Sequence, residues 1–83
     1  MEKAKVILID DNPSVLRLNG EFLERSDYEV ELFTSGTPAL EAIEKGGVDL
    51  VLLDLNMPDM DGFAACKKIR ETYSLEELPV IFL

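Results

Sequence analysis

Residues 5–14, KVILIDDNPS, decide the fold class of this chain. An apolar, mostly β-branched run without alternation is typical of a strand buried on both faces, as strands of parallel sheets are. The run leads directly into two adjacent carboxylates, Asp10 and Asp11. Like charges repel each other, and a carboxylate beside apolar residues loses hydration, so this pair adds no stability by itself. The pair therefore indicates a site at the end of a buried strand.

The rest of the chain alternates between strand and helix patterns. After the strand at 5–10, Asn12 and Pro13 are suited to open a helix, because asparagine caps helices and proline fits the first helical position. The other predicted segments are strands over 28–33, 48–53 and 79–83 and helices over 37–45 and 62–73. Strands that alternate with helices imply a parallel sheet with right-handed crossovers. The prediction is one α/β domain over residues 1–83, in the order β-α-β-α-β-α-β.

Two features predict where individual elements lie in this fold. Glu29 and Glu31 alternate with apolar residues in the second strand, which is typical of an edge strand. Gly20 indicates a close packing contact, because glycine inside a helix costs about 1 kcal/mol relative to alanine. Helical spacing predicts the apolar face of the first helix at Val15, Leu18, Asn19 and Phe22, widened by Leu16 and Leu23.

Composition narrows the classes of function. Acidic residues outnumber basic ones by 17 to 8, for a formal net charge of −9, so nucleic acid and anionic membranes are poor partners for this surface. The absence of histidine excludes a histidine-based triad or zinc site. Cys66 is the only cysteine, so no intrachain disulfide forms and a reducing cytoplasm is the expected setting. No apolar run approaches the roughly 18 residues of a membrane span.

A third acid, Asp54, follows the third strand, VDLVLL. Ligands of open α/β sheets bind beyond the carboxyl ends of the strands. If the first and third strands are neighbours, Asp10, Asp11 and Asp54 converge on one pocket, where their repulsion favours a hard divalent cation such as Mg²⁺ or Mn²⁺. A carboxylate beside such a cation can attack phosphorus and form an acyl phosphate. A single acid at a strand end is more often a solvated loop residue or a helix cap, and Asp59 and Asp61 are interpreted in that way.

The stretches ILIDDN and LVLLDLNMPDMDG together resemble the receiver domain of bacterial two-component response regulators. The resemblance extends over the whole chain and implies a flavodoxin-like, three-layer fold with strand order 2-1-3-4. It implies that Asp54 is the phosphoacceptor, that Asp11 binds Mg²⁺ directly and that Asp10 helps to position the ion. It also implies that Asn56 contributes its backbone carbonyl to the metal. The phosphoryl donor would be a histidine kinase or a phosphotransfer protein.

The chain departs from this family at its C-terminal side. Family members have five strands and five helices, with a Ser or Thr just after the fourth strand and a Lys at the end of the fifth. The expectation is therefore a truncated receiver that lacks the last helix, strand and helix, and that small phosphodonors modify slowly. The fourth strand, PVIFL, would then be an apolar edge without a charged residue. A homodimer through Val80, Ile81 and Phe82 would cover that edge.

Two other classes of function remain open. The chain could be a truncated or engineered receiver fragment that folds and self-associates without phosphotransfer, which the missing Ser/Thr and Lys favour. It could also be a metal-dependent phosphatase with an aspartate nucleophile. That class usually needs a second acid two residues after the nucleophile, and Asn56 occupies that position here. The phosphatase is therefore the weakest of the three interpretations.

Overall fold

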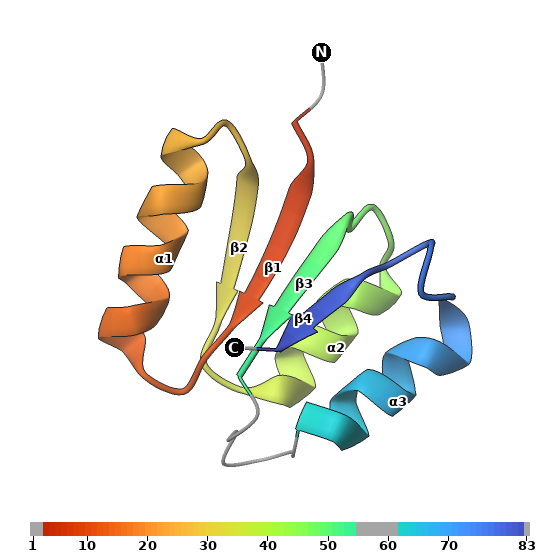
Figure 1. The fold of residues 1–83 in the computed structure, drawn as a ribbon. Coiled ribbons are helices and arrows are strands. Elements are labelled where there is room, and N and C mark those ends of the chain that lie inside the picture. Colours follow the sequence, from red (N-terminus) through yellow and green to blue (C-terminus); the bar gives the residue numbers. More distant parts are fainter. Residues whose placement is uncertain (1–2, 55–61, 83) are drawn as a thin grey trace.

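Residues 3–54 and 62–82, the part of the chain described by the computed structural model, form a parallel sheet with helices on both faces (Figure 1). The elements in chain order are β1 (Lys5–Ile9), α1 (Pro13–Arg25), β2 (Glu29–Phe33), α2 (Gly36–Glu44), β3 (Leu50–Leu53), α3 (Gly62–Thr72) and β4 (Val80–Phe82). The strands lie in the order β2-β1-β3-β4, and every neighbouring pair is parallel. The predicted fold class and strand order are confirmed.

The register of β1 with β3 places the ends of the two strands side by side. Ile9, the last residue of β1, lies opposite Leu53, the last residue of β3. Asp10 and Asp54 are the next residues of their chains, so both follow the strands at the same edge of the sheet. This arrangement meets the condition that the sequence left open, namely that the first and third strands are neighbours.

The main core lies on the sheet face covered by α2 and α3, whereas α1 lies on the other face (Figure 1). It consists of side chains from β1 and β3 together with the inner faces of the two helices and the segment before β4. These buried residues are Ile7, Ile9, Ala39, Ile43, Val51, Leu53, Ala65, Ile69 and Leu78. Because β1 is apolar on both faces, Val6 and Leu8 are also buried, on the α1 side of the sheet.

α1 buries only part of the apolar face that the sequence predicted. Leu16 is buried, as is Gly20, whereas Leu18 and Phe22 are 68% and 70% exposed. The helix packs mainly against β2, which is an edge strand. No other described strand or helix covers Leu18 and Phe22. The close contact expected at Gly20 is confirmed, because a Cβ there would lie 2.9 Å from a methyl carbon of Leu32.

The predicted position of β2 in the sheet is confirmed, and the start of β3 differs from the prediction. β2 is an edge strand, as the alternation of Glu29 and Glu31 predicted. β3 begins at Leu50, two residues later than expected. At this end of the strand the N–H of Lys5 donates to the side chain of Asp49 at 2.8 Å, and the first residue pair of the two strands is Val6 with Leu50.

The burial pattern predicts how two leucines differ in their contribution to stability. Leu53 is fully buried, so Leu53→Ala should lower the free energy of unfolding by about 2–5 kcal/mol through lost contacts and a residual cavity. Leu75 is 68% exposed, and Leu75→Ala should change it by no more than about 0.5 kcal/mol. Urea denaturation followed by circular dichroism measures both. Equal losses in the two variants would contradict the described core.

Candidate functional site

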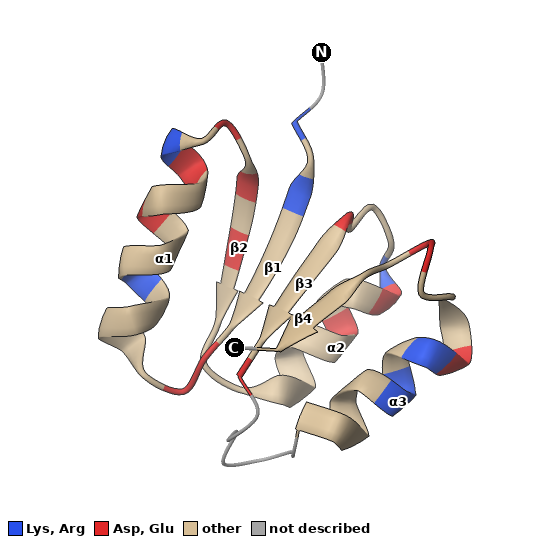
Figure 2. Ribbon diagram, viewed as in Figure 1, with Lys and Arg blue, Asp and Glu red and all other residues tan. Residues whose placement is uncertain are grey.

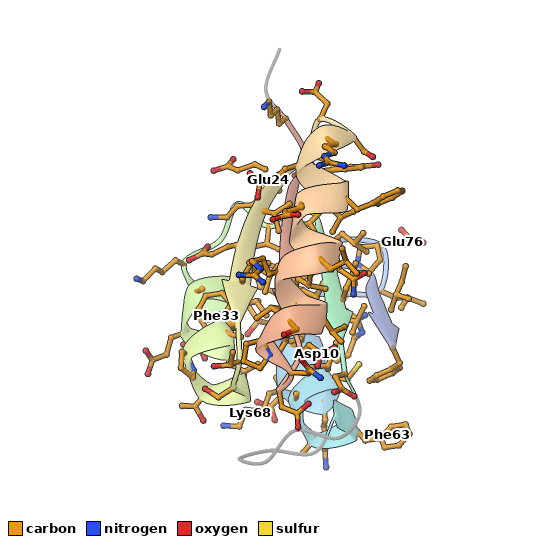
Figure 3. The ribbon with its side chains drawn as sticks, turned by 90° about the vertical axis from the view of Figure 1, so that its left-hand side faces the viewer. Asp10, Glu24, Phe33, Phe63, Lys68 and Glu76 are labelled. Carbon is orange, nitrogen blue, oxygen red and sulfur yellow. The ribbon has the colours of Figure 1, made fainter. Side chains whose placement is uncertain are left out.

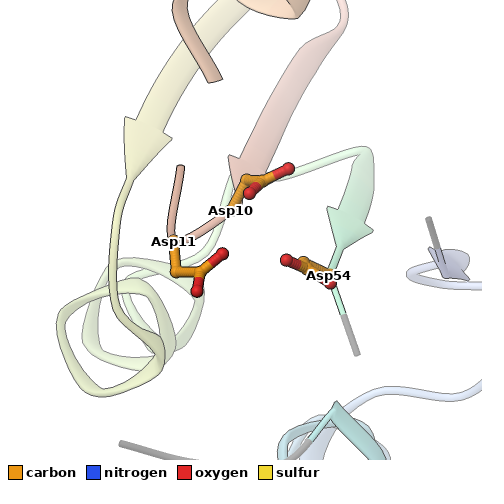
Figure 4. Close-up of side chains that lie close together, drawn as sticks. All are labelled: Asp10, Asp11 and Asp54. Atoms are coloured by element: carbon orange, nitrogen blue, oxygen red, sulfur yellow. The ribbon is translucent and has the colours of Figure 1, made fainter. Parts of the chain in front are cut away.

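The carboxyl ends of β1 and β3 bring three of the predicted acids together (Figure 4). Asp10, Asp11 and Asp54 each offer a carboxylate oxygen, and these oxygens lie within 4.8 Å of one another. The N–H of Asp54 donates to the carbonyl of Ile9 at 2.9 Å, which ties the third acid to the end of β1. Acidic residues follow both strands at the same edge of the sheet in Figure 2. The predicted convergence of the three acids is therefore observed.

The three carboxylates differ in their exposure to solvent. Asp10 is buried, with 8% of its surface exposed, whereas Asp54 is half-buried and Asp11 is exposed. A buried carboxylate needs hydrogen-bond donors to replace lost water. The N–H of Asn12 supplies one, at 2.9 Å from Oδ1 of Asp10. Asp10 is thus the anchored member of the cluster, and Asp54 and Asp11 are the more solvent-exposed members.

Asn12 does more than the sequence predicted. Its side chain caps α1 as expected, because Oδ1 accepts from the N–H groups of Ser14 at 3.0 Å and Val15 at 3.3 Å. The hydrogen bond from its backbone to Asp10 was not predicted. The signal that could have revealed it is an aspartate two residues before a backbone amide at a chain reversal, the pattern of an Asx turn.

Crowding changes the protonation of the exposed acid. The pKa of Asp11 is raised above its ordinary value of 3.8. Lost hydration is the largest cause, followed by hydrogen bonding to Asp54, the charge of Asp54 and the charge of Asp10. The folded protein therefore resists holding all three acids ionised, which is the electrostatic condition that a bound cation relieves.

Several predicted residues lie away from the cluster or outside the described residues. Asn56, Asp59 and Asp61 belong to residues 55–61, which the structure does not describe. Cys66 is a free thiol on α3 and is only half-buried. Among the described residues, no helix has the length and apolar character needed to cross a membrane.

One hollow of the described surface lies away from the acid cluster. It has a volume of about 550 Å³ and is lined by Lys3, Lys5, Glu29, Gly47, Val48 and Asp49, at the amino end of the strands. Its lysines form ion pairs with neighbouring acids, Lys3 with Asp27 at 3.5 Å and Lys5 with Glu31 at 3.3 Å. The acid cluster is the better candidate for a functional site, because it brings three carboxylates together at the carboxyl ends of the strands.

The chemistry of the cluster fits a hard divalent cation. Its donors are three carboxylates, and oxygen donors of this kind suit Mg²⁺ and Mn²⁺, which keep part of their water shell. The half-buried Asp54 keeps an accessible carboxylate beside that position. Acids at the ends of adjoining parallel strands lie where open α/β sheets bind their ligands. The chain belongs to the response regulator receiver domain family, whose model matches residues 6–83.

Individual relatives agree with this assignment to two-component signalling. The chain is 43% identical over 76 residues to the signal transduction histidine-protein kinase BarA of Escherichia coli, covering 92% of this chain and 8% of that protein. It is 37% identical to the regulatory protein VanRc of Enterococcus gallinarum, covering 95% of this chain and 33% of that protein. The structure matches chemotaxis response regulator CheY4 of Vibrio cholerae with a TM-score of 0.90 and 32% identity, covering 98% of this chain and 68% of that one.

The raised pKa of Asp11 predicts how pH acts on stability. Folding favours the protonated acid, so the stability that this group contributes is complete below pH 3.8 and is lost as pH rises through the higher pKa of the folded state. Asp54→Asn removes a negative charge from the cluster and should lower the pKa of Asp11. The variant should therefore gain stability relative to the parent protein as pH rises through that window.

Carbon-detected NMR titration of the Asp11 carboxyl group and urea denaturation over a pH series measure the two effects. Glu24→Gln is the matched control, because Glu24 is an exposed acid near the end of α1 remote from Asp10 (Figure 3). It should show no comparable gain with pH. An unchanged Asp11 pKa in Asp54→Asn would refute the electrostatic coupling.

Proposed function

We propose that Asp54 accepts a phosphoryl group from a phosphohistidine of a histidine kinase or phosphotransfer protein, with Mg²⁺ held at Asp10, Asp11 and Asp54. The observation that carries this proposal is the meeting of these three carboxylates within 4.8 Å at the ends of adjoining strands. The backbone carbonyl of Asn56 completes the proposed ligand set from outside the described residues. Mn²⁺ has the same preference for oxygen ligands and can replace Mg²⁺.

The burial of each acid suits its proposed role. Asp10 is buried and anchored by the Asn12 N–H, so it fits a fixed role behind the cation. Asp11 is exposed beside it and fits direct coordination. Asp54 is half-buried, so one of its oxygens can face the cation while the other faces an incoming donor. The division of roles implied by the family resemblance is thus compatible with the geometry.

The proposed reaction is a single displacement at phosphorus. A carboxylate oxygen of Asp54 forms the new O–P bond as the N–P bond of the donor phosphohistidine breaks, and the imidazole nitrogen keeps the electron pair and takes up a proton. A bound Mg²⁺ neutralises negative charge on the phosphoryl oxygens. The role of this chain is to orient the Asp54 carboxylate and to present it to the donor.

The relatives support this class of partner. BarA is named as a histidine-protein kinase and VanRc as a regulatory protein, and the chain spans only 8% and 33% of their lengths. The receiver fold is thus a portion of larger signalling proteins, and we propose that residues 1–83 act as one receiver unit. A cytoplasmic location fits this proposal, because Cys66 is free and the described fold relies on no disulfide.

A second candidate function, self-association of the 83-residue polypeptide, follows from β4. In the described sheet β4 pairs only with β3, and its residues VIF carry no charge. Val80 and Phe82 pack against the main core, whereas Ile81 is 50% exposed on the opposite side of the strand. An uncharged strand edge next to exposed apolar surface favours pairing with a second copy. We propose a homodimer through β4 as this alternative.

Phosphotransfer from a phosphohistidine protein tests the main proposal. The parent chain should acquire a label that hydroxylamine removes, as expected for an acyl phosphate, and EDTA should suppress the transfer. Asp54→Asn should reduce labelling to background because the nucleophilic oxygen is gone. Phosphopeptide mass spectrometry locates the label.

Asp27→Asn is the matched control for that experiment. Asp27 is exposed, lies at the other end of the sheet and has a φ of 71°, a conformation that asparagine tolerates. This variant should be labelled like the parent chain. Undiminished labelling of Asp54→Asn, or a label on another residue, would refute the assignment of Asp54.

Sedimentation equilibrium tests the self-association. The 83-residue polypeptide should sediment as a dimer at micromolar concentrations, and Ile81→Lys should shift it to monomer because a charge at the contact cannot be desolvated cheaply. Leu75→Lys adds the same charge at a residue that is 68% exposed in the α3–β4 connection, and it should leave the dimer intact. A folded monomer in the parent protein would exclude this alternative.

A further inference from the structure

Asn12 forms hydrogen bonds on two sides of the junction between β1 and α1. On the side of the acid cluster, its N–H donates to Oδ1 of Asp10 at 2.9 Å. On the side of the helix, its side-chain Oδ1 accepts from Ser14 at 3.0 Å and Val15 at 3.3 Å. Its carbonyl accepts the N–H of Leu16 at 3.0 Å. One residue therefore joins a buried carboxylate to the first turn of a helix.

The Asn12 cap satisfies the free N–H groups of the first turn of α1. The first N–H groups of a helix have no partner within the helix, and Pro13 at the first position has no N–H to satisfy. The amides of Ser14 and Val15 are the remaining donors of the first turn, and Asn12 Oδ1 accepts from both. Loss of this one oxygen would remove the side-chain partner of both N–H groups.

The same cap controls the direction of the Asn12 N–H. Asn12 has an extended backbone, with φ −92° and ψ 108°, and this conformation aims its side chain at the helix and its N–H at Asp10. Asp10 is 8% exposed, so its carboxylate cannot exchange this donor freely for water. The orientation of Asp10 thus depends on the backbone conformation that the cap holds.

We propose that Asn12 is a positioning residue that couples the cation site to the first turn of α1. This inference rests on the proposed function, because the cation is the ligand for which Asp10 is oriented. The cap holds the Asn12 backbone, the backbone N–H holds Asp10, and Asp10 holds its place in the cluster. Groups that orient metal ligands in this way strengthen metal binding about 10- to 100-fold.

Coupling of this kind acts in both directions. If the capped turn strengthens cation binding by a given factor, cation binding must stabilise the capped turn by the same factor. The cation would then tighten the start of α1, the helix that exposes Leu18 and Phe22. Binding of the cation would in this way affect the helix that carries the exposed side chains of Leu18 and Phe22.

Calorimetric titration with MgCl₂ measures the first direction. Asn12→Ala should weaken Mg²⁺ binding about tenfold, the lower end of the range for such residues, because the link to Asp10 runs through the backbone. Asn12→Ser should stay within about twofold of the parent, because serine caps helices about as well as asparagine. If Asn12→Ala weakened Mg²⁺ binding only by destabilising α1, a variant that destabilises the same helix elsewhere would weaken binding equally.

Ser26→Ala is the matched control for destabilisation of the same helix. Its hydroxyl donates to the carbonyl of Phe22 at 3.1 Å at the other end of α1, with no contact to the acids. This variant should lose stability and keep the Mg²⁺ affinity of the parent. Equal weakening of Mg²⁺ binding in Ser26→Ala and Asn12→Ala would reduce the role of Asn12 to helix stability and overturn the inference.

Amide hydrogen exchange measures the second direction on the parent protein, so it decides the question even if Asn12→Ala fails to fold. Mg²⁺ should slow exchange at Ser14 and Val15 by about the factor by which Asn12→Ala weakens binding. Exchange at Ser26 should respond less. Mg²⁺ binding without any change at Ser14 and Val15 would overturn the coupling and leave the proposed function standing. No Mg²⁺ binding by the parent protein would overturn both.

Discussion

The pairing of β1 with β3 is the constraint on which the rest of the molecule depends. One backbone hydrogen bond, from Asp54 to Ile9 at 2.9 Å, fixes the position of the third acid relative to the first two. Parallel pairing brings both carboxyl ends to the same edge, whereas an antiparallel arrangement would place them at opposite edges. The cluster is thus a consequence of topology, since Asp10 and Asp54 cannot separate without a break in the central sheet.

The same pairing explains how the protein tolerates a site that opposes folding. The pKa of Asp11 is raised by lost hydration first and by Asp54 and Asp10 second, so folding disfavours its ionised form. β1 and β3 carry the side chains that offset this cost, since Ile7, Ile9 and Leu53 are no more than 1% exposed. Each such burial contributes about 1.5–3 kcal/mol relative to an exposed side chain. The apolar strands that precede the acids therefore supply the stability that their charges remove.

The sequence predicted the strands and the acids that follow them, which depend on residue type. It did not predict the features that depend on packing between elements. Continuous apolar runs identified β1 and β3, and the acids that follow them identified the site. Helical spacing showed that Leu18 and Phe22 share a face of α1, but it could not show which part of that face a strand would cover. The bond from Asn12 to Asp10 depends on backbone angles at a single junction, and residue types alone do not determine those angles.

The site draws on only two neighbouring strands of the fold. Asp10, Asp11 and Asn12 are consecutive, and the pairing of two short strands adds Asp54. Nothing in this geometry requires a particular neighbouring domain. A unit of this kind can keep its chemistry in different proteins, in agreement with its similarity to a histidine-protein kinase at 43% identity and to a regulatory protein at 37%. The exposed side of α1 lies outside the cluster, and the first turn of this helix is joined to the acids through Asn12.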